Sequence, residues 1–373
     1  MKKVLLVSNT VMHYRVSVYN YFWGRFREEG WDFSVITNEL QKQNRIPPRF
    51  PLTEMAFNFF RYRRHIRSLR PDVVILFLHL KDRIAWPLVH WLNLTGIPTV
   101  SWTKTRNLDD PHNPVRNAAF NYFHSLCDGL IVYTDALVDL LPKNQRHKAF
   151  VANNTINFED FPRIEESKEK IKESLGIPFR KVVLFVGRIG EARNRKKVDH
   201  LVEMFRELKR EDIGLVIVGS SMPERIKSRL NPTNTRYLGE IQDPENLQIS
   251  RIFKMADIAS IPGHVGLGLN QAFYWGLPVV TEDGLQPPEI CYLKDGRNGF
   301  IVPENDFGAL RDRILYLADN DEVRSQFSAN ARNDILERAS TEGMFLGFLK
   351  CVDFLHARKQ QDGSKLTKKG QLC

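Results

Sequence analysis

Residues 258–281, IASIPGHVGLGLNQAFYWGLPVVT, contain the pattern that decides the fold. The two ends, 258–262 and 278–281, are short apolar runs of the length typical of buried strands. Residues 267–275 between them have the composition of a packed helix, and Gly276 suits the left-handed position at which a helix ends. A strand, a helix and a second strand in this order are the repeating unit of a parallel sheet covered by helices.

The same alternation recurs on both sides of a polar stretch near residue 157. We therefore predict an α/β protein with two Rossmann-like, doubly wound domains that face each other across a cleft. The expected domains are residues 1–157 and 158–342, and in residues 343–373 a helix that packs back on the first domain precedes an irregular basic tail. The other expected strands are 4–8, 33–37, 73–77, 99–102, 130–134, 182–187 and 214–219. The other expected helices are 16–27, 52–69, 115–125, 198–209 and 246–255.

The composition is that of a soluble globular protein. The chain has 373 residues, of which 42% are hydrophobic and 26% charged, enough for two cores. Its four cysteines form no CxxC pair and no Cys/His cluster with zinc spacing, which favours a reduced, cytoplasmic setting. No segment has the pattern of a signal peptide or a membrane span.

The net charge of +10 lies mostly on the N-terminal half and suggests an anionic partner there, with a solvated basic face as the alternative. In 52–69, Phe57 and Phe60 accompany Arg61, Arg64 and Arg67. Aromatic rings beside arginines suit peripheral contact with the inner face of an anionic membrane and a lipid-linked acceptor, although an ordinary basic surface explains them equally well. Nucleic acid is not expected as a partner, because no nucleic-acid-binding module is present.

Three glycines, Gly263, Gly266 and Gly268, separate the strand at 258–262 from the helix that follows. Glycines at such a place let backbone N–H groups approach an anion, and the helix N-terminus adds a favourable partial charge. The alternative is a core helix whose glycines only permit close packing.

A second basic segment supports anion binding. In LFVGRIGEARNRKKVDHLVEMF (184–205), Arg188 follows a strand, and Lys196 and Lys197 precede a helix. Cations before a helix oppose its dipole, which suggests that a bound diphosphate offsets the cost. Ordinary surface lysines are the alternative.

These motifs resemble those of glycosyltransferase family 4, the retaining nucleotide-sugar transferases of GT-B architecture. The resemblance rests on FVGRI, KKVDHLVEMFRELK, LVIVGSS, YLGEI, ADIASIPG, AFYWGLPVVT and PEICYLKDGRNGFIV, and more weakly on VLLVSN and HYRVSVYNYF in the first half. It implies a GT-B fold, a nucleoside-diphosphate sugar (UDP or GDP) as donor substrate and no separate cofactor. No convincing Asp-x-Asp motif follows a strand, so we expect no metal.

The resemblance also implies a donor site, and this sequence departs from the family pattern at two positions of that site. The family pattern has a glutamate at the positions of Gly263 and Gln271; the Gln271 amide oxygen can still accept a ribose hydrogen bond, whereas Gly263 offers no side chain to the sugar. The implied donor-binding residues are Gly187, Arg188, Lys196, Lys197, Gly219, Gly239, Glu240, Ile241, His264, Gly266, Leu267, Gly268 and Gln271.

The first half supplies the remaining candidates. His13 joins Arg188 and Lys196 as a catalytic candidate, and the expected acceptor-binding residues are Tyr14, Arg15, Lys104 and Arg106. Core packing of Tyr14 and a surface position of His13 are the alternatives.

The expected function is therefore transfer of a sugar, with retention, to a glycan or lipid-linked acceptor of a surface polysaccharide such as capsule, exopolysaccharide or lipopolysaccharide. The alternatives are a GT-B sugar-nucleotide epimerase or hydrolase, for which Glu289 is a further candidate, and a degenerate, non-catalytic partner subunit.

Overall fold

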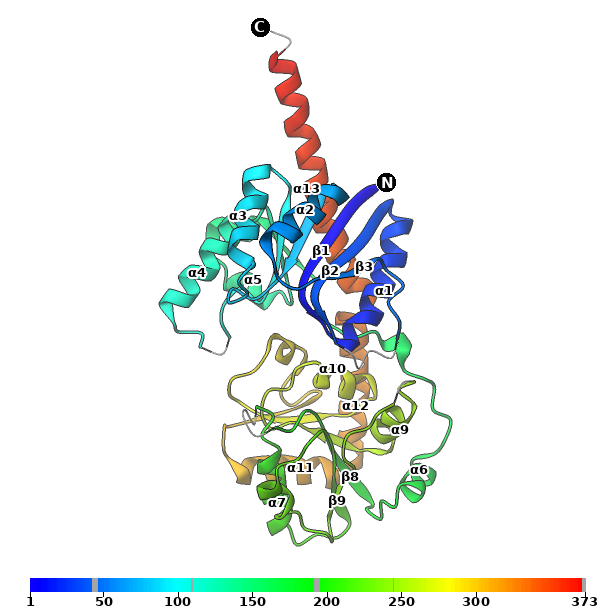
Figure 1. Cartoon of the computed structure of the whole chain (residues 1–373). Coiled ribbons are helices and arrows are strands. Elements are labelled where there is room, and N and C mark those ends of the chain that lie inside the picture. Colours follow the sequence, from blue (N-terminus) through cyan, green and yellow to red (C-terminus); the bar gives the residue numbers. More distant parts are fainter. Residues whose placement is uncertain (42–45, 109, 191–194, 244, 371–373) are drawn as a thin grey trace. The chain divides into compact units, whose positions relative to one another are not determined.

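The computed structural model describes residues 1–41, 46–108, 110–190, 195–243 and 245–370. It contains two compact units, each with its own sheet. Unit 1 consists of Met1–Asn157 and Thr341–Cys373, and unit 2 of Phe158–Ser340. The chain thus leaves unit 1 after residue 157, builds unit 2, and returns to unit 1 for its last helix (Figure 1).

Unit 1 is built on a parallel sheet with the strand order β3-β2-β1-β4-β5-β6-β7. Strand β4 and residues 4–7 of the central strand β1 are wholly apolar, because helices cover both faces of such a sheet. The strands are β1 (Lys2–Val11), β2 (Trp31–Leu40), β3 (Leu52–Glu54), β4 (Val73–Phe77), β5 (Thr99–Thr103), β6 (Gly129–Val132) and β7 (Ala149–Val151). The helices are α1 (His13–Glu28), α2 (Phe59–Leu69), α3 (Ala85–Thr95), α4 (Pro114–Ser125), α5 (Ala136–Asp139) and α13 (Thr341–Gly370), with a 3₁₀ turn at Lys143–Lys148.

The last helix, α13, completes the core of unit 1. It contacts α1 and strands β4, β6 and β7. Phe345 packs edge-on against Phe26 with ring centroids 4.9 Å apart, and Phe348 packs against Phe22 at the same separation. These four rings are buried, so the C-terminal helix is part of the hydrophobic core of the first unit.

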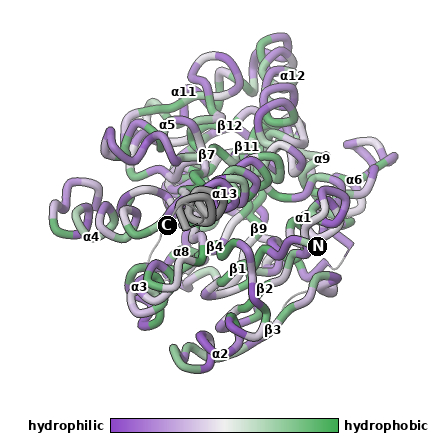
Figure 2. The backbone as a smooth tube through the Cα atoms, turned by 90° about the horizontal axis from the view of Figure 1, so that it is seen from above, coloured by the Kyte–Doolittle hydropathy of each residue, from purple (hydrophilic) through white to green (hydrophobic). Residues whose placement is uncertain are grey.

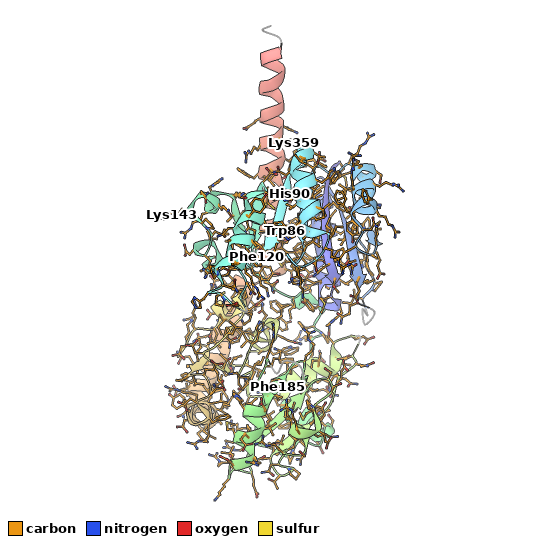
Figure 3. All side chains as sticks on the ribbon, turned by 60° about the vertical axis from the view of Figure 1, so that its left-hand side comes forward. Trp86, His90, Phe120, Lys143, Phe185 and Lys359 are labelled. Atoms are coloured by element: carbon orange, nitrogen blue, oxygen red, sulfur yellow. The ribbon has the colours of Figure 1, made fainter. Side chains whose placement is uncertain are left out.

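Two other helices of unit 1, α3 and α4, pack together through aromatic rings. Trp86 of α3 stacks on Tyr122 of α4, with centroids 6.0 Å apart, and meets Phe123 edge-on. Figure 3 shows Trp86 and His90 along α3, facing the helix that carries Phe120.

Unit 2 repeats the architecture with a parallel sheet in the order β10-β9-β8-β11-β12-β13. Its central strand β8 is buried along nearly its whole length, and Phe185 lies inside the unit (Figure 3). The strands are β8 (Lys181–Val186), β9 (Ile213–Val218), β10 (Thr235–Tyr237), β11 (Ile258–Ser260), β12 (Val279–Glu282) and β13 (Gly299–Val302). The helices are α6 (Lys168–Ser174), α7 (Val198–Glu207), α8 (Glu224–Lys227), α9 (Leu247–Met255), α10 (Leu267–Tyr274), α11 (Phe307–Asp319) and α12 (Asp321–Arg338), with 3₁₀ turns at Phe158–Asp160 and Pro288–Tyr292.

The strand–helix–strand prediction for 258–281 is confirmed by β11, α10 and β12. Ala259 pairs in parallel with Val279. Gly276 has φ +68° and directly follows the residue that caps α10. Colouring by hydropathy shows hydrophobic strands inside the units and mixed faces on outer helices such as α12 (Figure 2).

Two expectations were wrong. The single helix expected at 52–69 is instead strand β3, which pairs with β2, followed by α2, whose first turn is capped by the Asn58 side chain. The tail expected to be irregular continues α13 as far as Gly370. A short edge strand is fixed by its neighbour more than by its own sequence, which explains the first error. Among the helices described, none is long and apolar enough to cross a membrane.

Candidate functional site

The candidate site of unit 2 lies where β9, β8 and β11 end side by side. In a parallel sheet, the carboxyl ends of neighbouring strands meet at one edge, where ligands usually bind. Gly187, Gly219 and Gly263 follow these three strands. A Cβ atom on Gly219 would lie 2.1 Å from the Gly187 carbonyl oxygen, so bare backbone from two strands forms this edge.

The side chain of Lys196 crosses this edge. A Cβ on Gly187 would lie 2.4 Å from the lysine Cδ, so that glycine makes room for the side chain. The Nζ atom donates hydrogen bonds to the carbonyl oxygens of His264 (3.1 Å) and Val265 (3.0 Å). The ammonium group is therefore held at the loop that leads into α10.

The environment of Lys196 disfavours its charged form. Burial and, to a lesser extent, the nearby Arg188 lower the pKa of Lys196 from 10.5 to about 8, while Glu289 acts in the opposite direction. Arg188 is exposed, and the first turn of α10 contains no acidic residue. Two cations near a helix N-terminus without an acidic first turn make a place where an anion would be stabilised.

The neighbouring Lys197 has a different environment. It adopts φ +51° just before α7, and its Nζ donates to Glu282 Oε2 (2.9 Å) and Glu304 Oε1 (2.7 Å). Glu282 is 1% exposed and also contacts His200 Nδ1 at 2.5 Å. Lys197 therefore links the start of α7 to the end of β12, and its charge is compensated by carboxylates.

The side chain of Gln286, which no sequence motif indicates, supports the glycine loop. Its Nε2 donates to the carbonyl oxygens of Gly263 (3.0 Å) and Glu282 (2.9 Å) and to Thr281 Oγ1 (3.1 Å). Its Oε1 accepts from the backbone N–H of Val265 at 3.1 Å. The only available signal was its place in the loop after β12, because these contacts join segments about twenty residues apart.

The structure gives a steric reason for glycine at position 263. A Cβ there would lie 2.0 Å from the carbonyl oxygen of Arg195, and the Gly263 N–H donates to the Lys196 carbonyl at 3.1 Å. No side chain fits without moving the backbone. Gln271 lies half-buried on α10, and within the described part of the chain its side chain has no hydrogen-bond partner.

The other predicted donor residues lie on the adjoining loops. Gly239 has φ +74°, and its carbonyl accepts from the Gly219 N–H at 2.9 Å, which joins these two loops. Glu240 is exposed and Ile241 is half-buried. Gly266, with φ +56°, immediately precedes α10, which begins with Leu267 and Gly268.

In unit 1, His13, Tyr14 and Arg15 form the start of α1. His13 is exposed and contacts Gln41 Oε1 at 3.1 Å. Arg15 is 3% exposed; its guanidinium donates to Asn154 Oδ1 at 2.5 Å and lies 4.9 Å from the Trp102 ring centroid. These contacts favour a structural role for Arg15, whereas the half-buried Tyr14 edge-packs against His13.

Lys104 and Arg106 lie in the loop after β5. Lys104 is exposed, with its Nζ 5.7 Å from the Tyr133 ring centroid, and Arg106 is half-buried. Thr105 between them has φ +67° and donates its N–H to Thr103 Oγ1 at 3.0 Å. This hydrogen bond supports the turn at Thr105, and the neighbouring Lys104 is exposed.

No group of three or more His, Cys, Asp or Glu residues within the described ranges is arranged to hold a metal ion.

Comparison with solved structures identifies the fold. A glycosyltransferase from Rickettsia africae ESF-5 superposes with a TM-score of 0.76 at 16% identity, covering 95% of this chain and 98% of that one. Anabaena Alr3699/HepE, solved with UDP and glucose, gives a TM-score of 0.73 at 12% identity over 95% of this chain and 100% of that one. The chain has the GT-B fold, which confirms the predicted fold class.

Unit 2 also matches a protein family by sequence. Residues 167–334 match the family described as glycosyl transferases group 1. Poly(ribitol-phosphate) alpha-N-acetylglucosaminyltransferase of Staphylococcus aureus (strain COL) is 24% identical over 225 residues, 58% of this chain and 42% of that protein. Phosphatidyl-myo-inositol mannosyltransferase of Mycobacterium leprae (strain TN) is 31% identical over 157 residues, 40% of each chain. The matches span less than half the length of these curated relatives.

Proposed function

We propose that this protein is a retaining glycosyltransferase of family 4 that transfers a sugar from a nucleoside-diphosphate donor to a glycan or lipid-linked acceptor. Its context would be assembly of a surface polysaccharide such as capsule, exopolysaccharide or lipopolysaccharide. The observation that carries the proposal is the Lys196 ammonium, held with Arg188 near the start of α10 by bare backbone and with a lowered pKa.

In this proposal Lys196 exchanges its two carbonyl contacts for the donor diphosphate, and Arg188 approaches the same phosphates. Both cations would neutralise the charge that builds on the departing nucleoside diphosphate. The N–H groups of Gly266, Leu267 and Gly268 would add donors at the helix start. Gln271 would accept a ribose hydrogen bond, and Gln286 would position the loop. Lys197, already paired with Glu282 and Glu304, would not touch the donor.

The proposed mechanism uses no metal and no covalent enzyme intermediate. No side chain of the described site presents an evident nucleophile, so the acceptor would attack the front face while the leaving phosphate takes its proton. His13, Tyr14 and Lys104 would contribute from unit 1, and the buried Arg15 would support α1. Loss of the acidic pair at Gly263 and Gln271 is the feature that favours a degenerate subunit as the alternative.

A transfer assay distinguishes these functions. UDP-, GDP- and TDP-sugars are offered with a lipid-linked or glycan acceptor to the wild type and to the Arg188→Ala and Lys196→Ala variants. We expect transfer by the wild type and a decrease in kcat of about 100-fold or more in the Lys196 variant. Retention is read from the anomeric configuration of the product by NMR.

Each other outcome contradicts a defined part of the proposal. Full activity in both variants removes the diphosphate assignment. Conversion of the donor without transfer indicates an epimerase or hydrolase, and nucleotide binding without turnover indicates the non-catalytic subunit.

We also propose a peripheral contact of unit 1 with the inner face of an anionic cytoplasmic membrane. Phe60 on α2 is 72% exposed, and Arg61, Arg64 and Arg67 on the same helix are exposed as well. Co-sedimentation with vesicles containing phosphatidylglycerol should decrease in a Phe60→Ala/Arg64→Ala variant. Equal sedimentation of the variant and the wild type would contradict the contact.

A further inference from the structure

A cavity of about 690 Å³ in unit 2 lies away from the donor-site candidates. Its lining includes Asp257, which precedes β11, and Trp275, which follows α10. Both positions are at the amino-terminal edge of the sheet. Gly187, Gly219 and Gly263 mark the opposite edge, so the cavity is not part of the site described above.

The lining of this cavity is strongly basic. Its only carboxylate is Asp257, which is compensated by Lys168 Nζ at 3.3 Å and by the N–H of Val182 at 2.9 Å. Arg324 is paired with Asp321. The remaining cations, Arg163, Lys254 and Arg332, have no carboxylate partner among the residues that the structure describes.

Aromatic rings form another part of the lining. Phe161 lies 5.4 Å from Tyr274 between ring centroids, and Trp275 meets both rings edge-on. The Arg332 guanidinium lies 5.0 Å from the Tyr274 centroid and donates to the Tyr274 carbonyl. Rings beside guanidinium groups suit a ligand that has both an apolar face and a negative charge.

The hydrogen-bonding side chains that the described lining leaves without a partner can all donate a hydrogen bond. The hydroxyls of Ser325 and Ser328 and the exposed guanidinium of Arg163 have no partner within the described part of the chain. The one carboxylate of the lining is already bonded. An anion therefore matches the cavity, and a volume within the usual range of small-ligand sites leaves room for more than a single phosphate.

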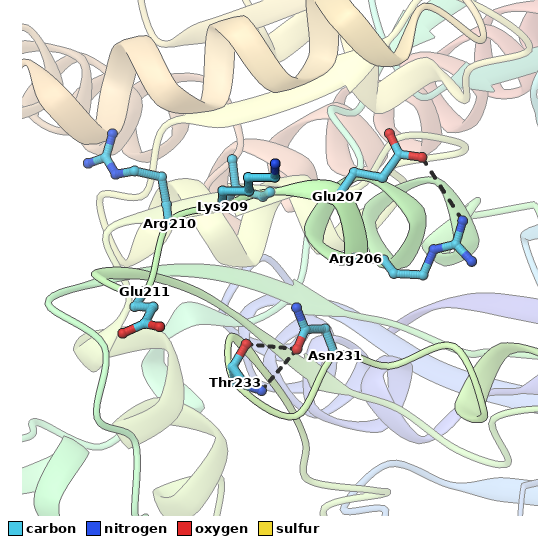
Figure 4. A pocket seen from close by; sticks show the side chains of 8 residues that line it. Arg206, Glu207, Lys209, Arg210, Glu211, Asn231 and Thr233 are labelled. Carbon is cyan, nitrogen blue, oxygen red and sulfur yellow. Dashed lines mark hydrogen bonds and ion pairs between the residues drawn. The ribbon is translucent and has the colours of Figure 1, made fainter.

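A second cavity in unit 2 provides the contrast. It is lined by Arg206, Lys209 and Arg210 together with Glu207 and Glu211, and no aromatic residue contributes (Figure 4). Arg210 is bonded to Asp212 and Asp319. This second cavity is nearly balanced in charge and offers no ring surface, so of the two cavities the first alone has a basic, aromatic lining.

We propose that the basic, aromatic cavity binds a phosphorylated saccharide. Arg163 and Arg332 would hold the phosphate, the serine hydroxyls would contact sugar hydroxyls, and Tyr274 and Trp275 would contact the ring. The ligand is either a free sugar phosphate or a phosphate-bearing unit of a longer glycan. This proposal is independent of the donor site and of the reaction proposed above.

Isothermal titration calorimetry of the full chain tests the proposal with glucose 6-phosphate, glucose, inorganic phosphate and an oligomannoside with a terminal phosphate. We expect glucose 6-phosphate or the phosphorylated oligomannoside to bind at least tenfold more tightly than glucose or inorganic phosphate. Tighter binding of glucose 6-phosphate would identify the ligand as a free sugar phosphate. Tighter binding of the phosphorylated oligomannoside would identify it as a phosphate-bearing unit of a longer glycan. The Arg163→Ala variant, which loses no contact within the described structure, should bind at least tenfold more weakly with an unchanged melting temperature.

Arg332→Lys, which keeps the charge but loses the planar group over Tyr274, should weaken binding less than Arg332→Ala. Lys209→Ala in the other cavity is the matched control and should bind as the wild type does. Binding of neither phosphorylated saccharide overturns the proposal, and so does inorganic phosphate binding as tightly as they do. An Arg163→Ala variant with wild-type affinity also overturns it, while nucleotide binding measured on the same samples reports separately on the donor site.

Discussion

At the scale of single residues, the two adjacent lysines have separate tasks. The Lys196 ammonium donates to two backbone carbonyls and has a lowered pKa, whereas Lys197 is bonded to two carboxylates. The sequence motif KKVD could not separate them, because the difference depends on Glu282 and Glu304, which lie far along the chain.

Lys197→Ala should therefore decrease stability. The substitution leaves the buried Glu282 without its lysine, and losing a hydrogen bond to a charged group costs about 1.5–3 kcal/mol. Urea denaturation measures the change, with the exposed Lys209→Ala as control. Wild-type stability of the Lys197 variant would contradict the structural role given to this residue.

A second prediction for a single residue concerns Gly263. Gly263→Ala should destabilise the protein by about 1–3 kcal/mol and disturb donor binding, because the new Cβ would lie 2.0 Å from a backbone oxygen. Gly263→Glu should then fail to restore an acidic contact to the sugar. Gly190→Ala is the control, since a Cβ there meets no atom within 4 Å. A Gly263→Glu variant with raised activity would show that the loop can accept a side chain.

At the scale of elements, helix α13 makes the clearest prediction. Phe348→Ala should reduce the stability of the protein by about 3–5 kcal/mol, because the ring is buried between Phe22 and Trp102. Leu346→Ala on the same helix is the control, since Leu346 is partly exposed. Thermal denaturation measures both variants. Similar melting temperatures would mean that α13 contributes little to the core of unit 1.

The strands and helices differ in how well the sequence predicts them. Strands such as β4 and β8 and the unit β11-α10-β12 were predictable, because their apolar runs, glycines and prolines are local signals. Strand β3 was mistaken for helix because three residues at an edge carry little signal of their own. The continuation of α13 through its basic end was missed because a polar composition does not by itself exclude a helix.

At the scale of the whole molecule, the fold could be predicted and the site only in part. The glycine edge at residues 187, 219 and 263 follows from the positions of strand ends, and Lys196 follows from its place before a helix. The support from Gln286 and the burial of Arg15 could not be predicted, because each depends on contacts between distant segments. The basic, aromatic cavity likewise brings together residues from four helices of unit 2 (α6, α9, α10 and α12) and from the loops beside them.

The pH dependence of donor binding tests whether Lys196 holds the donor diphosphate. In the unbound protein Lys196 loses its proton above its pKa of about 8, so its affinity for the diphosphate should decrease as pH rises through 8. The stability of the unbound protein should change in the opposite direction and increase as the pH rises. Because the folded-state pKa is below the usual 10.5, the charged lysine costs stability below pH 8, and that cost is relieved between pH 8 and 10.5.

The measurement is calorimetric titration of the nucleoside diphosphate that binds best among UDP, GDP and TDP, between pH 7 and 9, with the wild type, Lys196→Arg and Lys196→Met. We predict that the wild-type dissociation constant increases by up to about tenfold per pH unit above pH 8. In Lys196→Arg it should stay nearly constant, because arginine remains charged, and Lys196→Met should bind weakly at every pH. The same pH dependence in the wild type and Lys196→Arg, or undiminished binding by Lys196→Met, would contradict the claim that Lys196 holds the donor diphosphate.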